Sequence, residues 1–391
     1  MNYPESLLQW IWGTLQFDPR SIRTTEGLEL QIISPGILNC SDGPDYKHAC
    51  CRIDGLKWYG SIEIHWKSSD WYRHDHHRNP AYDNVFLHIV IEDNMQVPVQ
   101  TFHGHKPHTL NLGSYINEPL KTLFKRFDTP GLLPCAPYIG ACSSNIFKKQ
   151  LDKANKAYFE KKVELLMREY PSELPLSKAW YAMVTIGLFD GLGILHNRAP
   201  MRQLAEHILY KNRATLFSDN EDSFIKWVDG LAFGKGNSWS RQWHTKSCRP
   251  ANHPVNRVKQ AAGLYFYLSR TTFRDWLSLH NDPAELWKDI LRRARYRPGK
   301  QRAAVLYTTV LLPAIYILGQ LTHSTAKKNW AYNAWRQGGL RIPKSIEKVY
   351  KDAGIESDYI LYNPGAIYQK KAYCDQRQCN NCEVLKSAVY S

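Results

Sequence analysis

The sequence predicts an α+β amino-terminal domain followed by an all-α domain. Two observations support this prediction. In the first hundred residues, one helical pattern is followed by short alternating or apolar runs that end at Gly, Pro, Asn or Asp. After about residue 120, strand signals are nearly absent, and long apolar periodicities of helical spacing replace them. We therefore expect two domains, over residues 1–118 and 119–391.

The first domain is expected to contain helix, strand, strand, strand, helix and strand, in that order. Residues 3–17 place apolar side chains at helical spacing. Asp54-Gly55 is a strong hairpin signal between the second and third strands. The last strand is a continuous apolar run, as expected for a strand buried on both faces. The expected strands are 28–33, 46–53, 58–66 and 85–91, with a helix at 70–77 and a further edge strand at 97–102.

The second domain is expected to be helical at 148–168, 176–195, 202–210, 256–268 and 303–321. Residues 303–326 carry no Lys, Arg, Asp or Glu and are long enough to span a bilayer. The Thr, Tyr, Gln and Pro residues within this run favour a buried core helix instead. The first ten residues lack the basic and apolar regions of a secretory signal, so we expect a cytoplasmic protein.

The charge balance indicates an anionic partner. The 391 residues include 51 Lys and Arg against 36 Asp and Glu, a formal net charge of +15. Nucleic acid is the first candidate, an anionic membrane surface the second, and simple solubility explains the charge without any partner. The densest basic stretch contains Arg292, Arg293, Arg295 and Arg297. It suits phosphate binding, although a solvated helix end explains it equally well.

The most informative motif is Gly43-Pro44-Asp45, followed after seventeen residues by Glu63-Ile64-His65. An acid at the start of one strand and an acid on its hairpin neighbour bring two carboxylates together. Two carboxylates suit Mg²⁺ or Mn²⁺, which activate water and neutralise charge on a phosphodiester. His65, two residues past Glu63, points to the same side of the strand and is a candidate general base. Without a metal, Gly-Pro-Asp is a common turn and a lone strand Glu is usually solvated.

This arrangement resembles the PD-(D/E)XK nuclease superfamily, which has an α-β-β-β-α-β core of the restriction-endonuclease type. The resemblance implies that Asp45 and Glu63 bind Mg²⁺ or Mn²⁺ and that His65 occupies the position of the catalytic Lys. Glu5, on the first helix, resembles an acidic residue that some members place there. Because His is usually neutral at pH 7, Lys67 on the same strand face could supply the missing positive charge.

Over nearly its whole length the chain also resembles a bacterial family of unknown function. The matching segments are GPDY (43–46), GSIEIHWKSSDWYRHDHH (60–77), NVFLHIVIED (84–93), Leu133-Pro134-Cys135, RPANHPVNR (249–257) and the terminal cysteines. This second resemblance implies no activity.

Histidines follow the third strand in the sequence His74-Asp75-His76-His77. On a continuous helix, His74 and His77 would share a face and His76 would point elsewhere. A transition-metal site, phosphate binding beside Arg73 and Arg78, and a plain exposed helix are all compatible with this pattern.

Three cysteines cluster near the carboxyl end in the pattern Cys374-x4-Cys379-x2-Cys382. In a reducing compartment such a cluster indicates a metal site. We expect Cys135 as the fourth ligand, with Cys142 and Cys248 as alternatives. Four thiolates fit either Zn²⁺ or an iron–sulfur cluster. Some nucleases of the resembled superfamily hold a [4Fe–4S] cluster with one upstream and three downstream cysteines, which favours iron–sulfur.

Together these observations predict a metal-dependent nuclease or a nuclease-derived DNA-processing protein, with DNA favoured over RNA. One alternative is a non-catalytic nucleic-acid-binding protein with a structural cysteine–metal site. Another is a Zn- or Mn-dependent hydrolase built on the histidines.

Overall fold

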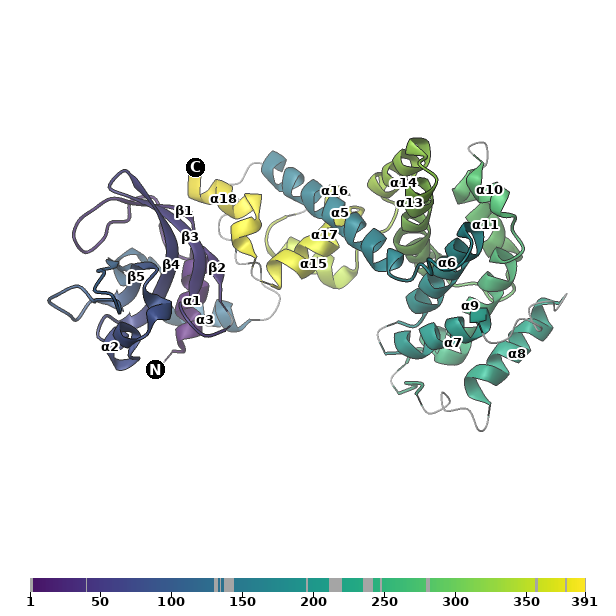
Figure 1. Ribbon diagram of the computed structural model, residues 1–391, viewed down its shortest axis with the longest axis horizontal. Coiled ribbons are helices and arrows are strands. Elements are labelled where there is room, and N and C mark those ends of the chain that lie inside the picture. Colours follow the sequence, from purple (N-terminus) through teal and green to yellow (C-terminus); the bar gives the residue numbers. More distant parts are fainter. Residues whose placement is uncertain are drawn as a thin grey trace. The chain divides into compact units, whose positions relative to one another are not determined.

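The structure is a computed structural model, shown in Figure 1, that describes residues 3–39, 41–129, 133, 135–136, 144–194, 196–210, 220–234, 242–246, 248–278, 282–355, 358–376 and 378–390. Contacts divide the chain into two compact units. The first unit comprises Met1–Ala154, Ile342–Leu361 and Gly365–Ser391, and the second comprises Asn155–Arg341 and Tyr362–Pro364. A mixed sheet in the amino-terminal part followed by a helical region confirms the coarse fold prediction.

The first unit is built on a curled mixed sheet. Its strands are β1 (Leu30–Ser34), β2 (Ile37–Leu38), β3 (Tyr46–Ile53), β4 (Leu56–Lys67), β5 (Val85–Glu92) and β6 (His108–Asn111). The strand order is β1-β3-β4-β5-β6, and β2 also pairs with β3. The pairs among β1 to β4 are antiparallel, whereas β4 with β5 and β5 with β6 are parallel.

The β3–β4 hairpin confirms the turn signal. Asp54 and Gly55 have φ values of 46° and 82°, as a two-residue turn of this kind requires, and Ile53 pairs with Leu56. The edge of the sheet differs from the prediction. Residues 97–102 form no strand, and β6 takes the place expected for them.

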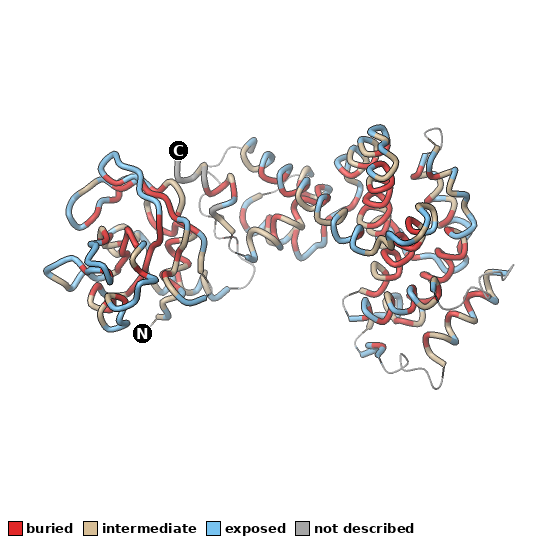
Figure 2. The backbone as a smooth tube through the Cα atoms, viewed as in Figure 1, coloured by how far each residue is buried: buried red, intermediate tan, exposed pale blue. Residues whose placement is uncertain are grey.

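Two layers cover the two faces of the sheet. Helix α1 (Glu5–Gly13) packs its apolar side on one face, in a core shared with Ile62 and Ile64 of β4. On the other face, the crossover from β4 to β5 contains α2 (Asp70–Arg73) and two 3₁₀ turns, η1 (His76–Arg78) and η2 (Pro80–Tyr82). Because side chains alternate along a strand, Glu63 and His65 point toward this crossover. In Figure 2 the strands are largely buried and the surrounding loops exposed.

The carboxyl-terminal segments complete the first unit. They contain α15 (Lys344–Asp352), α16 (Asp358–Leu361), α17 (Gly365–Tyr368) and α18 (Glu383–Tyr390), and α3 (Leu120–Asp128) lies earlier in the chain. Leu385 is buried in the same core as α1 and the sheet. Leu133, Ile342 and Tyr350 belong to a separate small core that joins segments about two hundred residues apart.

The second unit is helical in its described residues. After α5 (Ser144–Met167), which begins in the first unit, come α6 (Leu176–Leu192), α7 (Arg198–Tyr210), α8 (Glu221–Phe233), α9 (Pro254–Leu268), α10 (Phe273–Leu277), α11 (Pro283–Arg293), α12 (Lys300–Leu306), α13 (Leu312–Leu321) and α14 (Thr325–Gln337). Trp180, Phe189 and Trp276 are fully buried within its core. The predicted helices therefore exist, with small differences in their ends.

One stretch of the described residues, Lys300–Leu321, is long and apolar enough to cross a membrane by length and composition. It runs through α12, a π-helical segment at Tyr307–Leu311, and α13. Of its most apolar segment, 61% is buried within the protein, as in the core helix of a globular protein. This helix is therefore weak evidence for a membrane span.

Candidate metal centre

Asp45 and Glu63 lie together where α1, the Gly43–Asp45 turn and β4 meet. The Asp45 carboxylate accepts hydrogen bonds from Gln9 Nε2 (2.7 Å) and from the backbone N–H of Ile64 (3.0 Å). The backbone N–H of Asp45 in turn donates to Glu63 Oε2 at 3.0 Å. Each acid is thus fixed by the backbone next to the other. The Asp45 and Glu63 pair expected from the sequence is adjacent in space.

Histidine side chains extend this pair into a larger cluster. His65 Nε2 lies 3.2 Å from His74 Nδ1 and 3.3 Å from His76 Nε2. Glu63 Oε1 lies 3.1 Å from His76 Nε2 and 3.5 Å from His65 Nε2. On the far side of its ring, His65 Nδ1 lies 2.9 Å from His88 Nε2 of β5. One carboxylate and three imidazoles therefore converge on a single point, with a fourth imidazole behind them.

The backbone after α2 decides which histidines join the cluster. The expectation that His74 and His77 share a face is wrong, because α2 ends at Arg73 and Asp75 adopts a left-handed conformation (φ 58°). This turn brings His76 inward, where its ring stacks on Tyr82 at 3.8 Å between centroids. His77 packs against Tyr72 instead.

Burial sets the charge state of the cluster. It raises the pKa of Glu63 to about 8, assisted by the charge of Glu5 and opposed by the Asp45 N–H. Burial and the charge of Glu63 raise the pKa of Asp45 to about 7. Burial and the neighbouring imidazoles lower the pKa of His65 to about 2, and burial lowers that of His88 to about 3. No Lys or Arg of the described residues forms an ion pair with Asp45 or Glu63.

A divalent cation fits this donor set. A neutral imidazole nitrogen carries either a proton or a lone pair, so His65 Nε2 cannot hydrogen-bond with three close neighbours at once. The donor atoms of His65, His74 and His76 lie within 4.8 Å of one another. Neutral imidazoles with a carboxylate suit Mn²⁺, Fe²⁺ or Zn²⁺, whereas Mg²⁺ prefers oxygen ligands alone. A cation would also compensate the carboxylates of Glu63, which is buried, and Asp45, which is half-buried, since neither has a Lys or Arg partner among the described residues.

The other predicted residues of the first unit lie around this cluster. Glu5 is close enough to act electrostatically on Asp45, Glu63 and His76. Lys67 is exposed and pairs with Glu92 at 3.3 Å, so its ammonium group is engaged at the surface.

The arginines expected to bind nucleic acid are exposed and, with one exception, form ion pairs with aspartates. In the first unit, Arg73 pairs with Asp70 (3.2 Å) and Arg78 with Asp75 (3.4 Å). In the second unit, Arg292 and Arg293 pair with Asp289, and Arg295 pairs with Asp222. Arg297 is exposed and has no ion-pair partner among the described residues. Four carboxylates therefore offset part of the charge of these six arginines.

The four cysteines Cys135, Cys374, Cys379 and Cys382 lie near one another in the first unit, although 238 residues lie between Cys135 and Cys374 in the sequence. Burial and the other three thiols raise the pKa of Cys135. The Gln369 amide nitrogen donates to the sulfurs of both Cys374 (3.7 Å) and Cys382 (3.6 Å). Of the two alternatives, Cys248 belongs to the second unit, and Cys142 lies outside the described residues.

Sequence reasoning missed the groups that orient the centre. Gln9 holds Asp45, and its position four residues after Glu5 on α1 is a signal that could have found it. Tyr82 and Gln369 carry no sequence signal for their roles, because each is defined only by what it contacts in the fold.

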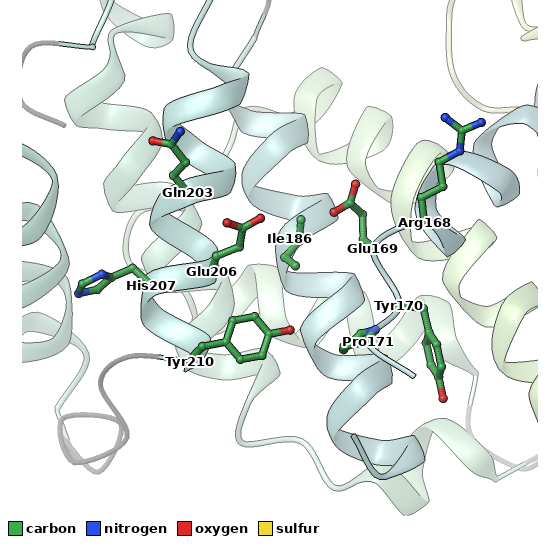
Figure 3. Close-up of a pocket in the computed structure, with 9 residues that line it drawn as sticks. All are labelled: Arg168, Glu169, Tyr170, Pro171, Ile186, Gln203, Glu206, His207 and Tyr210. Carbon is green, nitrogen blue, oxygen red and sulfur yellow. The ribbon is translucent and has the colours of Figure 1, made fainter. Parts of the chain in front are cut away.

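A separate pocket of about 550 Å³ lies in the second unit and is drawn in Figure 3. Glu169 and Glu206 extend toward the space between α6 and α7, and Glu169 forms an ion pair with Arg202. None of the residues expected to act in chemistry or binding lines this pocket.

The fold and site together define a mixed α/β protein whose sheet carries a buried centre of carboxylates and imidazoles. The chain belongs to the family described as "Protein of unknown function (DUF2851)", whose profile matches residues 5–235. This match confirms the predicted membership of a family of unknown function. No curated protein and no solved structure matches the chain significantly.

Proposed function

We propose that this protein is a metal-dependent phosphodiesterase that acts on nucleic acid, either a nuclease or a DNA-processing protein derived from one. The observation that carries the proposal is that the Glu63 carboxylate contacts both Asp45 and His65 beside the crossover: it accepts from the Asp45 N–H at 3.0 Å and lies 3.5 Å from His65 Nε2. The order α1, β1, β3, β4, α2, β5 supports a core of the restriction-endonuclease type, with β2 as an addition. The net charge of +15 supports an anionic polymer as substrate, and DNA is favoured over RNA.

The donor atoms and the burial of each side chain indicate which role it has in the proposed site. Asp45 and Glu63 would hold a divalent cation, Mn²⁺ or another transition metal in preference to Mg²⁺, together with the imidazoles. A cation bound there lowers the pKa of water and neutralises charge developing on a phosphodiester. His65 is 1% exposed, which suits a ligand better than the general base expected from the sequence. His74, the third imidazole of this set, is exposed, so the centre is open to water and to a substrate.

Replacing His76 with Ala should weaken the binding of Mn²⁺ or Co²⁺ more than about 100-fold, because removing a direct ligand costs more than removing an outer contact. The matched control is His77→Ala, one residue away and outside the cluster. Calorimetric titration and the visible spectrum of bound Co²⁺ provide the measurements. Equal losses in the two variants would contradict the assignment of His76 as a ligand.

The function itself is tested by incubating the full chain with labelled single- and double-stranded DNA and RNA, with and without Mg²⁺ and Mn²⁺. We expect cleavage of at least one substrate that requires the divalent ion, and its loss in Glu63→Gln. Binding of nucleic acid without cleavage would favour a non-catalytic binding protein. Metal binding without any effect on nucleic acid would favour a hydrolase of another substrate class.

We also propose that Cys135, Cys374, Cys379 and Cys382 hold a [4Fe–4S] cluster or Zn²⁺. Four thiolates are a donor set that either group takes, Cys135 lies near enough to the other three for their charges to act on it, and the amide of Gln369 reaches two of them. Such a group would tie the carboxyl-terminal segment to residues 133–136 and so has a structural role.

A further inference from the structure

We propose that a pocket at the open end of the β3–β4 hairpin binds one unpaired nucleotide of the substrate. The base of this nucleotide would stack on Tyr59 and its phosphate would contact Lys47. This inference rests on the proposed function, because it names the part of the substrate that the same site selects. It concerns a pocket that lies beside Asp45 and Glu63 but shares no residue with them.

The pocket has the size and chemistry of a nucleotide site. Its volume is about 490 Å³, within the range of small-molecule sites. Tyr59, Lys47, His48 and Asn84 supply an aromatic ring, a cation, an imidazole and an amide, and no carboxylate lines the pocket. Tyr59 is 68% exposed, so its ring is accessible for stacking on a base.

Strand geometry connects this pocket to the metal centre. Every second residue of a strand points to the same face of the sheet. One face of β4 therefore carries Tyr59, Ser61, Glu63 and His65. Tyr59 and Ser61 line the pocket, and Glu63 follows two residues later, about 7 Å along the strand. On the neighbouring segment, Pro44 lines the pocket and precedes Asp45. A chain of nucleotides lying along this face would pass directly from the pocket to the carboxylates.

A β-bulge aims the cationic groups at the pocket. Between Tyr46 and Ala49 the strand β3 carries one residue more than β4, and His48 has a left-handed backbone (φ 56°). Bulges are common beside active sites because they redirect side chains, and a left-handed non-glycine residue persists only where the surrounding structure holds it. Lys47 has no ion-pair partner among the described residues. Its ammonium lies 3.9 Å from where a Cβ on Gly43 would be, next to the turn that carries Asp45.

This combination favours a nucleotide over a bare anion or an apolar ligand. A phosphate alone would use Lys47 and His48 but leave Tyr59 without a role. Because a paired base in a duplex has no free face, the pocket selects a single strand, an end or a splayed nucleotide.

Calorimetry with a phosphorothioate hexadeoxynucleotide, 5′-dAMP and inorganic phosphate tests the proposal without any cleavage step. We expect the hexamer and dAMP to bind more tightly than phosphate. Tyr59→Ala should weaken both by about 10-fold, the usual effect of removing one stacking ring, and Tyr59→Phe should keep the wild-type affinity. Lys47→Ala should weaken all three ligands. The control is Tyr362→Ala, a 48% exposed tyrosine of the second unit.

The proposal that the pocket binds a nucleotide would be contradicted if Tyr59→Ala bound the hexamer and dAMP with unchanged affinity, or if phosphate bound as tightly as dAMP. The two proposals fail separately. If Tyr59→Ala loses nucleotide binding while the wild type cleaves no nucleic acid, the nucleotide pocket is supported and the proposed phosphodiesterase activity is wrong. If Tyr59→Ala binds nucleotides and cleaves nucleic acid as the wild type does, the nucleotide pocket is wrong and the phosphodiesterase activity is supported.

Discussion

Replacing Asp45 with Asn is expected to abolish metal-dependent cleavage and, at the same time, to stabilise the metal-free protein. The amide keeps the shape of the carboxyl group but carries no charge to bind a cation, so cleavage should fall at least about 1000-fold. The Gln9 side chain can rotate its amide to keep a hydrogen bond to the new residue. A cleavage assay with Mn²⁺ measures the first effect, and Asp42→Asn, an exposed acid of the same turn, is the matched control.

The stabilisation depends on pH with a definite sign. The pKa of Asp45 is raised from 3.8 to about 7 in the folded state, so the folded protein holds a proton that the unfolded chain releases above pH 4. Its contribution to stability is therefore fully present below pH 4 and is lost as the pH rises toward 7. By pH 8 the loss is on the order of 4 kcal/mol, and Asn does not incur it.

We therefore expect Asp45→Asn to unfold at least about 5 °C above the wild type at pH 8 in metal-free buffer, with little difference at pH 4. The lowered pKa values of His65 and His88 act in the opposite direction, but they are common to both proteins. Thermal unfolding followed by circular dichroism at the two pH values is the measurement. A variant less stable than the wild type at pH 8 would show that the Asp45 carboxylate is structural.

Replacing Cys374 with Ser is expected to remove the metal of the cysteine site and to destabilise the first unit by at least about 3 kcal/mol. The reason is that the binding free energy of a structural metal is part of the folding free energy. Metal analysis, the visible spectrum of anaerobically purified protein and urea unfolding are the measurements. Visible charge-transfer absorption with bound iron indicates a [4Fe–4S] cluster, and a colourless protein with one zinc indicates Zn²⁺.

The control for this prediction is Cys248→Ser, because Cys248 lies in the second unit, where its sulfur donates to the His244 carbonyl at 3.6 Å. This variant should keep both the metal content and the stability of the wild type. If Cys374→Ser also keeps both, the four thiols hold no metal.

Much of the local structure could be predicted from the sequence. The strand at 46–53, the Asp54-Gly55 turn and the helix around Leu7 and Ile11 follow from alternation, turn chemistry and helical periodicity, all of which act between near neighbours. The adjacency of Asp45 and Glu63 followed from the same hairpin. The edge strand β6 was missed because its four residues have little pattern of their own and are held by pairing with β5.

The sequence by itself determined the strands β3, β4 and β5, the face of β4 that carries Glu63 and His65, and the clustering of histidines and of cysteines along the chain. Only the tertiary structure decided that His76 and not His77 completes the cluster, because a single left-handed residue at Asp75 redirects the chain. It also decided that the carboxyl-terminal cysteines lie with Cys135 in the unit of the sheet. Such choices depend on packing between segments far apart in the chain, which no local pattern records.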